Sequence, residues 1–191
     1  MVRLIRLVAI VGGMALGPLH AQMTREDVAA RIEGVAGQMA RDGVRYNGRW
    51  TPPGSSTPWV MDCSNAVRWF FHHATGQMLP RTASDQYELL RKQGRIRRVN
   101  ARSTSWRKAL RPGDLLFWEN TYRPKRKPPV THVMVYLGRN ADGSLRMAGS
   151  QGSRGVGVYT FRPEVAYGGY TWFLWFKRKG QFVAVGRPLG K

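Results

Sequence analysis

Apolar residues recur at helical spacing in three segments in the first half of this chain. Thr24 is a good helix N-cap, and Asp27 follows it in the capping-box position. A helix over about 25–41 is then predicted by one apolar face, formed by Val28, Ile32, Val35 and Met39. A second helix is predicted to start at Cys63 and to end at Gly76, and its apolar face is formed by Cys63, Ala66, Val67, Phe70 and Phe71. A shorter third helix is predicted over about 83–93.

Strand-like segments fill the second half of the chain. They cover 114–118, 131–137, 144–148, 155–161 and 170–178, and "QFVAVG" at 181–186 is a candidate to complete the set. The aromatic residues of "YTWFLWFKR" are predicted to fill the core at alternate positions, rather than to form a carbohydrate platform. Helices followed by strands predict an α+β fold with a mainly antiparallel sheet of about five or six strands.

The N-terminal segment has the order of a secretory signal. Arg3 and Arg6 precede a short apolar run, and small residues follow it, with cleavage expected after Ala21. The alternative is an uncleaved membrane anchor. We expect a signal over 1–21, a single domain over 22–191, export to the periplasm or the medium, no integral membrane span after cleavage, and a monomer.

The chain is strongly basic, with a net charge of +20. Such a charge indicates an anionic partner. For an exported protein, cell-wall polymers and acidic envelope lipids are closer candidates than nucleic acid, which we do not expect as a partner. The alternative is that the charge only keeps the protein soluble.

Cys63 is the only cysteine of the chain, so no disulfide can form within it. It is either a buried small hydrophobic residue or a reactive thiol. Its place at the start of a predicted helix favours the reactive alternative, because the helix N-terminus lowers the pKa of a thiol.

A cysteine nucleophile needs a base, and the chain has four histidines. His20 lies in the predicted signal. His72 and His73 lie on the predicted Cys63 helix, roughly 14 Å along its axis from the sulfur. His132, at the start of a strand, is therefore the candidate base, although alone it would be read as a surface histidine. We expect no metal site and no cofactor, because one cysteine and few histidines lack zinc-ligand spacing.

Four short stretches follow one another along the chain: "DCSNAVRWFF", "LPRTASDQ", "LRPGDLLFW" and "HVMVYLG". In residues and in order they resemble the NlpC/P60 cysteine peptidases of bacterial cell walls, and the resemblance covers about 46–160. The first stretch departs from the usual "DCSG". The resemblance implies a papain-like fold and cleavage of an amide bond in peptidoglycan stem peptides, commonly the bond between D-glutamate and a diamino acid.

The resemblance also implies residue roles. Cys63 would attack the carbonyl carbon as a thiolate, and His132 would take the thiol proton and return it to the leaving amine. The backbone N–H of Cys63 is a candidate oxyanion donor. Tyr46 would help shape the site, and Asp62 and Ser64 either line the pocket or only cap the helix.

The third catalytic position departs from the family pattern. The polar residue that orients the base falls on Met147, which cannot do so, and Ser150 or Gln151 could substitute if the strand register shifts. The alternatives are therefore a catalytically impaired peptidoglycan-binding protein of the same fold, or a related cysteine amidase or acyl hydrolase with another substrate.

The segment 119–130, "ENTYRPKRKPPV", leads directly into the strand of His132. It is expected to overhang the active-site groove, where its four Lys and Arg residues could bind stem-peptide carboxylates or wall phosphates. The alternative is a solvated loop without a partner.

Overall fold

The structure is a computed structural model that describes residues 23–48, 60–173 and 176–190. The predicted signal segment 1–21 lies outside the described residues, as does most of the loop between the first two helices. No helix within these described ranges is both long and apolar enough to cross a membrane.

The three predicted helices are present, and side chains cap each of them. Helix α1 covers Arg25–Arg41 and begins with the Thr24–Asp27 capping box. Helix α2 covers Cys63–Thr75, with Asp62 as its N-cap and Gly76 in the left-handed conformation at its C-cap. Helix α3 covers Ala83–Lys92, with Thr82 as its N-cap. Capping and apolar periodicity are local signals, which is why the sequence predicts these helices well.

A six-stranded antiparallel sheet forms the centre of the molecule, in the order β1-β8-β2-β3-β4-β5. Its strands are β1 Ile96–Arg98, β2 Leu115–Glu119, β3 Val130–Arg139, β4 Leu145–Gln151, β5 Gly155–Phe161 and β8 Gln181–Gly186. Two short 3-10 helices, η1 Ser105–Ala109 and η2 Gly152–Arg154, lie between them in sequence. The predicted α+β class and antiparallel sheet are confirmed, and β1 is an additional strand that the sequence pattern did not reveal.

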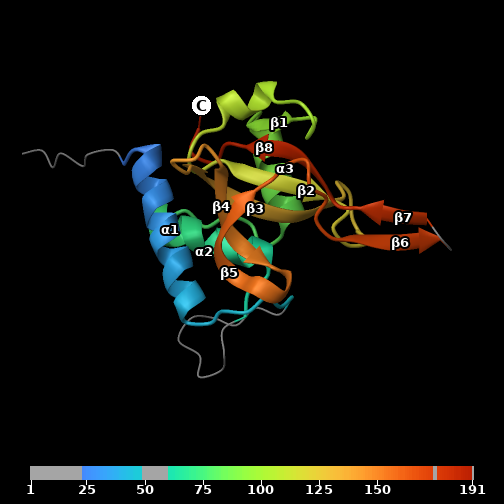
Figure 1. Cartoon of the computed structure of the whole chain (residues 1–191), viewed down its shortest axis with the longest axis horizontal. Helices are drawn as coiled ribbons and strands as arrows, with labels where there is room; N and C mark the ends of the chain where they lie inside the picture. The colour runs from blue at the N-terminus through green and yellow to red at the C-terminus, as the bar shows by residue number, and fades with distance from the viewer. Residues whose placement is uncertain (1–22, 49–59, 174–175, 191) are drawn as a thin grey trace, which may run out of the picture.

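The sheet separates two apolar clusters, because alternate side chains of a strand point to opposite faces. On one face, Val133 and Val135 of β3 pack with Phe70 and Phe71 of α2. On the other face, Met134 and its neighbours pack with Trp106 of η1. Figure 1 shows α1 and α2 side by side against the sheet. The helices thus cover one face, and the start of α2, with Cys63, reaches the sheet from that side.

The predicted single strand over 170–178 is wrong. The chain forms two strands there, β6 Gly169–Phe173 and β7 Phe176–Lys179, which pair only with each other. This hairpin projects from the body of the fold (Figure 1), and all four residues of β7 are exposed. The side chains of β7 therefore do not fill the core, contrary to the prediction. Strand pairing depends on partners elsewhere in the chain, and alternation within one segment cannot reveal it.

Candidate active site

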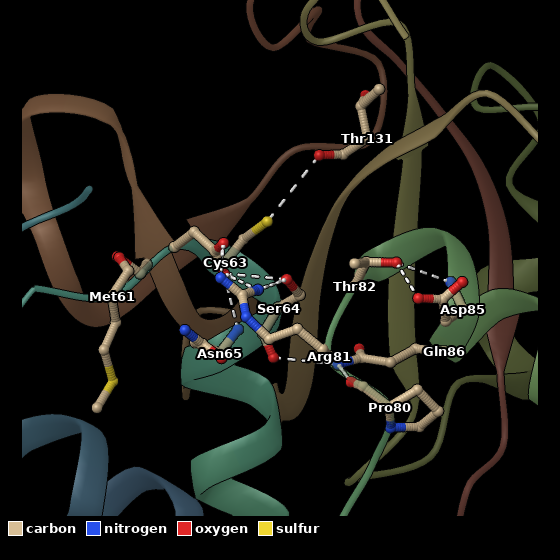
Figure 2. A network of polar contacts seen from close by, with 12 residues as sticks. Met61, Cys63, Ser64, Asn65, Pro80, Arg81, Thr82, Asp85, Gln86 and Thr131 are labelled. Carbon is tan, nitrogen blue, oxygen red and sulfur yellow. Dashed lines mark hydrogen bonds and ion pairs between the residues drawn. The ribbon is translucent and has the colours of Figure 1, made fainter. Parts of the chain in front are cut away.

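Cys63 lies where two neighbouring strands separate. β3 and β4 are paired from Val135 and Ala148 onward, but not toward the start of β3. The chain leading into α2 occupies this gap. The Ser150 hydroxyl of β4 donates a hydrogen bond of 2.7 Å to the Met61 carbonyl, and the Cys63 thiol donates a long one of 4.0 Å to the Thr131 carbonyl of β3. Figure 2 shows the sulfur directed at that carbonyl.

The Asp62 carboxylate fixes the start of α2. It accepts a bond of 2.9 Å from the Asn65 backbone N–H and two bonds, of 2.7 and 3.1 Å, from Arg81. Ser64 Oγ donates to Asp62 at 2.9 Å and accepts from Arg81 at 3.1 Å (Figure 2). The side-chain amide of Gln86 donates to the Ser64 and Pro80 carbonyls and so ties α3 to α2. Asp62 therefore caps α2, which is one of the two alternatives that the sequence left open, and Ser64 supports it.

The thiol of Cys63 is harder to ionise than the sequence predicted. Its side chain is almost fully buried, and burial raises the pKa of the thiol to about 12, with the Asp62 carboxylate adding to the effect. Hydrogen bonds from the backbone N–H groups of Val133, Ser64 and Cys63 itself lower the pKa of the thiol, but by less than burial raises it. The predicted lowering of the thiol pKa by the helix start is therefore wrong, because desolvation of the buried thiol outweighs the helix terminus.

His132 is held between two aromatic rings. It lies opposite Trp118 of β2, and the two rings meet edge to face at 5.4 Å between centroids. Tyr167 stacks on its other side at 4.5 Å, with an interplanar angle of 28°. The imidazole is only 2% exposed, and burial lowers its pKa to about 3. His132 is therefore neutral over the physiological range, as a general base must be before it accepts a proton.

The Cys63 sulfur lies against the backbone of β3 on either side of His132, and it does not bond the imidazole. The sulfur contacts the Thr131 carbonyl and lies near the Val133 N–H, so it touches the residues on both sides of His132. The imidazole itself extends to the face of the sheet that carries Trp118, opposite the helices. The thiol thus bonds a carbonyl rather than the imidazole in this state, although the two side chains flank the same short stretch of strand.

Two hollows adjoin this stretch. The first, here called the Cys63 groove, has a volume of about 370 Å³. It is lined by Tyr46, Gly48, Asp62, Cys63, Ser64, Arg81, Thr82, Ala83, Ser84, Tyr122, Arg126, Val130 and Thr131. The second, here called the His132 cavity, has a volume of about 450 Å³. It is lined by Trp118, His132, Met147, Gln151, Gly152, Arg154, Thr160, Arg162, Val165, Ala166 and Tyr167.

The NlpC/P60 family model matches residues 49–162, more than half of the sequence. The chain belongs to the NlpC/P60 family. This membership supports a peptidoglycan-related cysteine hydrolase in general terms and agrees with the papain-like α+β architecture.

One similar solved structure is a crystal structure from Staphylococcus aureus subsp. aureus Mu50, described as similar to lipoprotein, NLP/P60 family. It is 25% identical over 76% of this chain, with a TM-score of 0.45. The present chain spans 40% of the length of that protein. No curated protein matched.

The three candidates for the third NlpC/P60 position lie in different places. Met147 and Gln151 line the His132 cavity, whereas Ser150 turns the other way and bonds the Met61 carbonyl. Ser150 therefore stabilises the approach to Cys63 and does not face the base. Gln151 is the polar candidate that shares a cavity with His132.

The loop over 119–130 lies beside the Cys63 groove, as expected from the sequence. Tyr122 and Arg126 line the groove, and Arg126 also donates a hydrogen bond of 2.9 Å to the Thr82 hydroxyl at the start of α3. Tyr46 lines the same groove, where the predicted upstream tyrosine would be needed. Burial, together with the negative charge of an ionised Cys63, raises the pKa of the Tyr46 hydroxyl, so Tyr46 is a neutral hydrogen-bonding group there.

Sequence reasoning missed the aromatic partners of the base and the charge partner of Asp62. Trp118 ends the "LRPGDLLFW" stretch, but its pairing with His132 appears only in the structure. Arg81 belongs to "LPRTASDQ", but nothing local links it to Asp62. Tyr167 lies outside all four stretches, and no sequence signal points to it. Among the described residues, no three His, Cys, Asp or Glu side chains gather to hold a metal ion.

Proposed function

We propose that this protein is an exported cysteine hydrolase that cleaves an amide bond in peptidoglycan stem peptides, with the bond between D-glutamate and a diamino acid as the first candidate. Cys63 is the nucleophile and His132 the base. The observation that carries the proposal is the position of the Cys63 sulfur, which lies at the start of α2 against the two residues that flank His132. Family membership supplies the substrate class.

The reaction starts from an uncharged pair, because burial favours the neutral thiol and the neutral imidazole. The thiol proton passes to the imidazole when the Cys63 side chain turns away from the Thr131 carbonyl and the imidazole, which extends to the opposite face of the sheet in this state, turns toward the sulfur around the start of β3. The sulfur then forms a bond to the substrate carbonyl carbon, and the negative charge passes to the carbonyl oxygen. The backbone N–H of Cys63, at the helix start, is placed to stabilise that oxyanion.

Breakdown of this intermediate releases the amine. His132 returns the proton to the leaving nitrogen as the carbon–nitrogen bond breaks, leaving a thioester on Cys63. Water then attacks the thioester with His132 as base, which frees the acid product and restores the thiol. Arg81 holds the Asp62 carboxylate and so limits the repulsion that a thiolate next to it would experience.

The test is digestion of purified peptidoglycan with the protein, followed by mass spectrometry of the soluble fragments. The wild type should release stem-peptide fragments whose masses identify the cleaved bond, while Cys63→Ala and His132→Ala should release none. Circular dichroism of both variants confirms that they are folded. Release of fragments by either variant at the wild-type rate contradicts the proposed roles.

A second candidate is a catalytically impaired wall-binding protein of the same fold. The raised pKa of the thiol and the methionine at the third position favour it. In that case the wild type and both variants should bind sedimented peptidoglycan equally and release no fragments. Cleavage of a different amide or acyl substrate by the wild type alone would instead support a related hydrolase.

Export and wall binding belong to the same proposal. The basic loop over 119–130 lies beside the Cys63 groove, where its cations would attract wall phosphates or carboxylates. Replacing Arg123 and Lys125, which do not line the groove, with glutamine should weaken sedimentation with wall fragments at low salt. The Arg31→Gln/Arg102→Gln variant removes the same charge elsewhere and serves as the control. Equal sedimentation of both variants contradicts a role for the loop.

A further inference from the structure

The His132 cavity is a second hollow of the site, separate from the groove that holds Cys63. Each hollow contains one member of the proposed pair: the groove contains the sulfur, and the cavity contains the imidazole. The sulfur bonds the acyl carbon, whereas the imidazole protonates the departing amine. If the proposed function holds, the acyl half of the substrate therefore lies along the Cys63 groove and the amine half enters the His132 cavity.

Two arginines give this cavity a marked positive character. Arg154, in η2, and Arg162, just after β5, line its wall. No aspartate or glutamate belongs to its lining among the described residues, and neither arginine forms an ion pair with a described carboxylate. The nearby Glu164 is already paired with Arg107 at 3.0 Å. The two guanidinium groups are thus available to an anion that enters the cavity.

Arg154 also lies near the tyrosine that stacks on His132. Its guanidinium lies 5.9 Å from the centre of the Tyr159 ring, and its charge acts on the hydroxyl of Tyr167, which stacks on His132. Arg154 and the imidazole line the same cavity, and both lie near Tyr167. This arrangement suits a group attached to the leaving amine, because that amine must itself reach His132.

We propose that Arg154 and Arg162 form a carboxylate-binding site for the amine half of the substrate, so that the enzyme selects a leaving residue with a free carboxylate. The relevant chemistry is a carboxylate held by guanidinium groups, which bind it more directionally than lysine does. In a diamino acid that carboxylate has two sources, the α-carboxylate and a carboxylate at the end of the side chain. The inference rests on the proposed function, since the leaving side is defined by His132.

Three synthetic stem tripeptides show which of the two carboxylates is bound. Each ends in a diamino acid that carries both carboxylates: one tripeptide has both free, one has the α-carboxylate amidated, and one has the side-chain carboxylate amidated. For the wild type, amidation of the bound carboxylate should lower kcat/KM, mainly through KM, by about fivefold, as for a partly exposed ion pair. Arg154→Gln and Arg162→Gln should lower kcat/KM for the tripeptide with both carboxylates free. They should not change kcat/KM for the tripeptide in which the bound carboxylate is already amidated.

The Arg31→Gln/Lys92→Gln variant removes two exposed positive charges that line neither the cavity nor the groove, and it controls for long-range attraction. It should retain the wild-type preference. If the wild type cleaves all three tripeptides equally, or if the arginine variants affect all three alike, the inference is overturned while the proposed function stands.

Absence of cleavage with every tripeptide would contradict the proposed function, and a binding measurement then decides the inference. Calorimetric titration of Cys63→Ala with the free diamino acid and with its amides should show weaker binding of one amide, a difference that Arg154→Gln abolishes. Equal binding of all three compounds overturns the inference independently of catalysis.

Discussion

Tyr167 lies nearly parallel to the imidazole of His132, with the two ring centroids 4.5 Å apart. Trp118 meets the same imidazole edge to face, so aromatic rings fix its orientation from two sides. Tyr167 is itself held by a backbone hydrogen bond of 3.1 Å to the Gly180 carbonyl, at the base of the hairpin. We call Trp118 and Tyr167 the aromatic clamp. The clamp orients the imidazole of His132, for which Met147 provides no polar partner.

Replacing Tyr167 tests the clamp. Tyr167→Leu should lower kcat/KM by about fivefold, because an aromatic pair contributes about 1 kcal/mol beyond its buried area. The pKa of His132, followed by NMR, should rise toward 6.5 as water reaches the ring. Tyr167→Phe keeps the stack and should retain both the activity and the low pKa. Equal damage in both variants would show that the hydroxyl, and not the stack, is the important group.

The burial of His132 predicts how stability depends on pH. An unfolded histidine binds a proton near pH 6.5, whereas the folded imidazole binds one only near pH 3. The free energy of unfolding should therefore fall as the pH drops from 6.5 toward 3, by about 3 kcal/mol at pH 4.5. Urea unfolding of the wild type and of His132→Gln measures this contribution as their difference.

Asp114 also makes the free energy of unfolding depend on pH, so the contribution of His132 must be measured as the difference between wild type and His132→Gln. Burial raises the pKa of the Asp114 carboxyl to about 6, so its contribution to stability grows as the pH falls from 6 toward 3.8, opposite to that of His132. The contribution is common to both proteins and cancels in the comparison. A difference between wild type and His132→Gln that does not change with pH would contradict the buried, neutral imidazole.

The raised pKa of Cys63 predicts slow alkylation. Between pH 7 and 10 the rate with iodoacetamide should rise by about tenfold per pH unit without a plateau, because only the thiolate reacts. The label reports on one site, since Cys63 is the only cysteine. Asp62→Asn retains an N-cap but removes a charge that raises the pKa, and it should react faster. A plateau below pH 8 in the wild type would indicate a thiolate at rest.

The sequence predicted the elements that depend on local signals. The helix starting at Thr24 and the one ending at Gly76 were found because caps and periodicity lie within one or two turns. The hairpin β6–β7 was not found, because two short strands that pair only with each other look like one strand in sequence. The fold class followed from the order of elements, which does not depend on pairing.

The sequence predicted the two candidate residues, Cys63 and His132, but not the surroundings of their side chains. Cys63 followed from being unique and His132 from the exclusion of the other histidines. Their pKa values could not follow, since burial is a property of the packed molecule and outweighs the helix terminus. Tyr167 was also out of reach, because its stack depends on a segment 35 residues beyond His132 in the sequence.

Gly149 and Met134 are close neighbours on β4 and β3. A Cβ added at Gly149 would lie 2.2 Å from Sδ of Met134, which is fully buried. Gly149→Ala should therefore lower the free energy of unfolding by about 1–3 kcal/mol through overpacking. The Met134→Ala/Gly149→Ala double variant should be more stable than the sum of the two single effects predicts. Strict additivity in thermal unfolding would show that the two positions do not share this space.

The central claim is that Cys63 forms the covalent bond to the substrate, and labelling with a substrate-like inhibitor tests it most directly. A stem peptide that carries an acyloxymethyl ketone in place of the cleaved amide is incubated with the protein, and the labelled peptide is located by mass spectrometry. The account predicts one inhibitor per protein, attached to Cys63, with peptidoglycan cleavage lost in proportion and labelling slowed in His132→Ala. Cleavage that persists after Cys63 is fully labelled would contradict it.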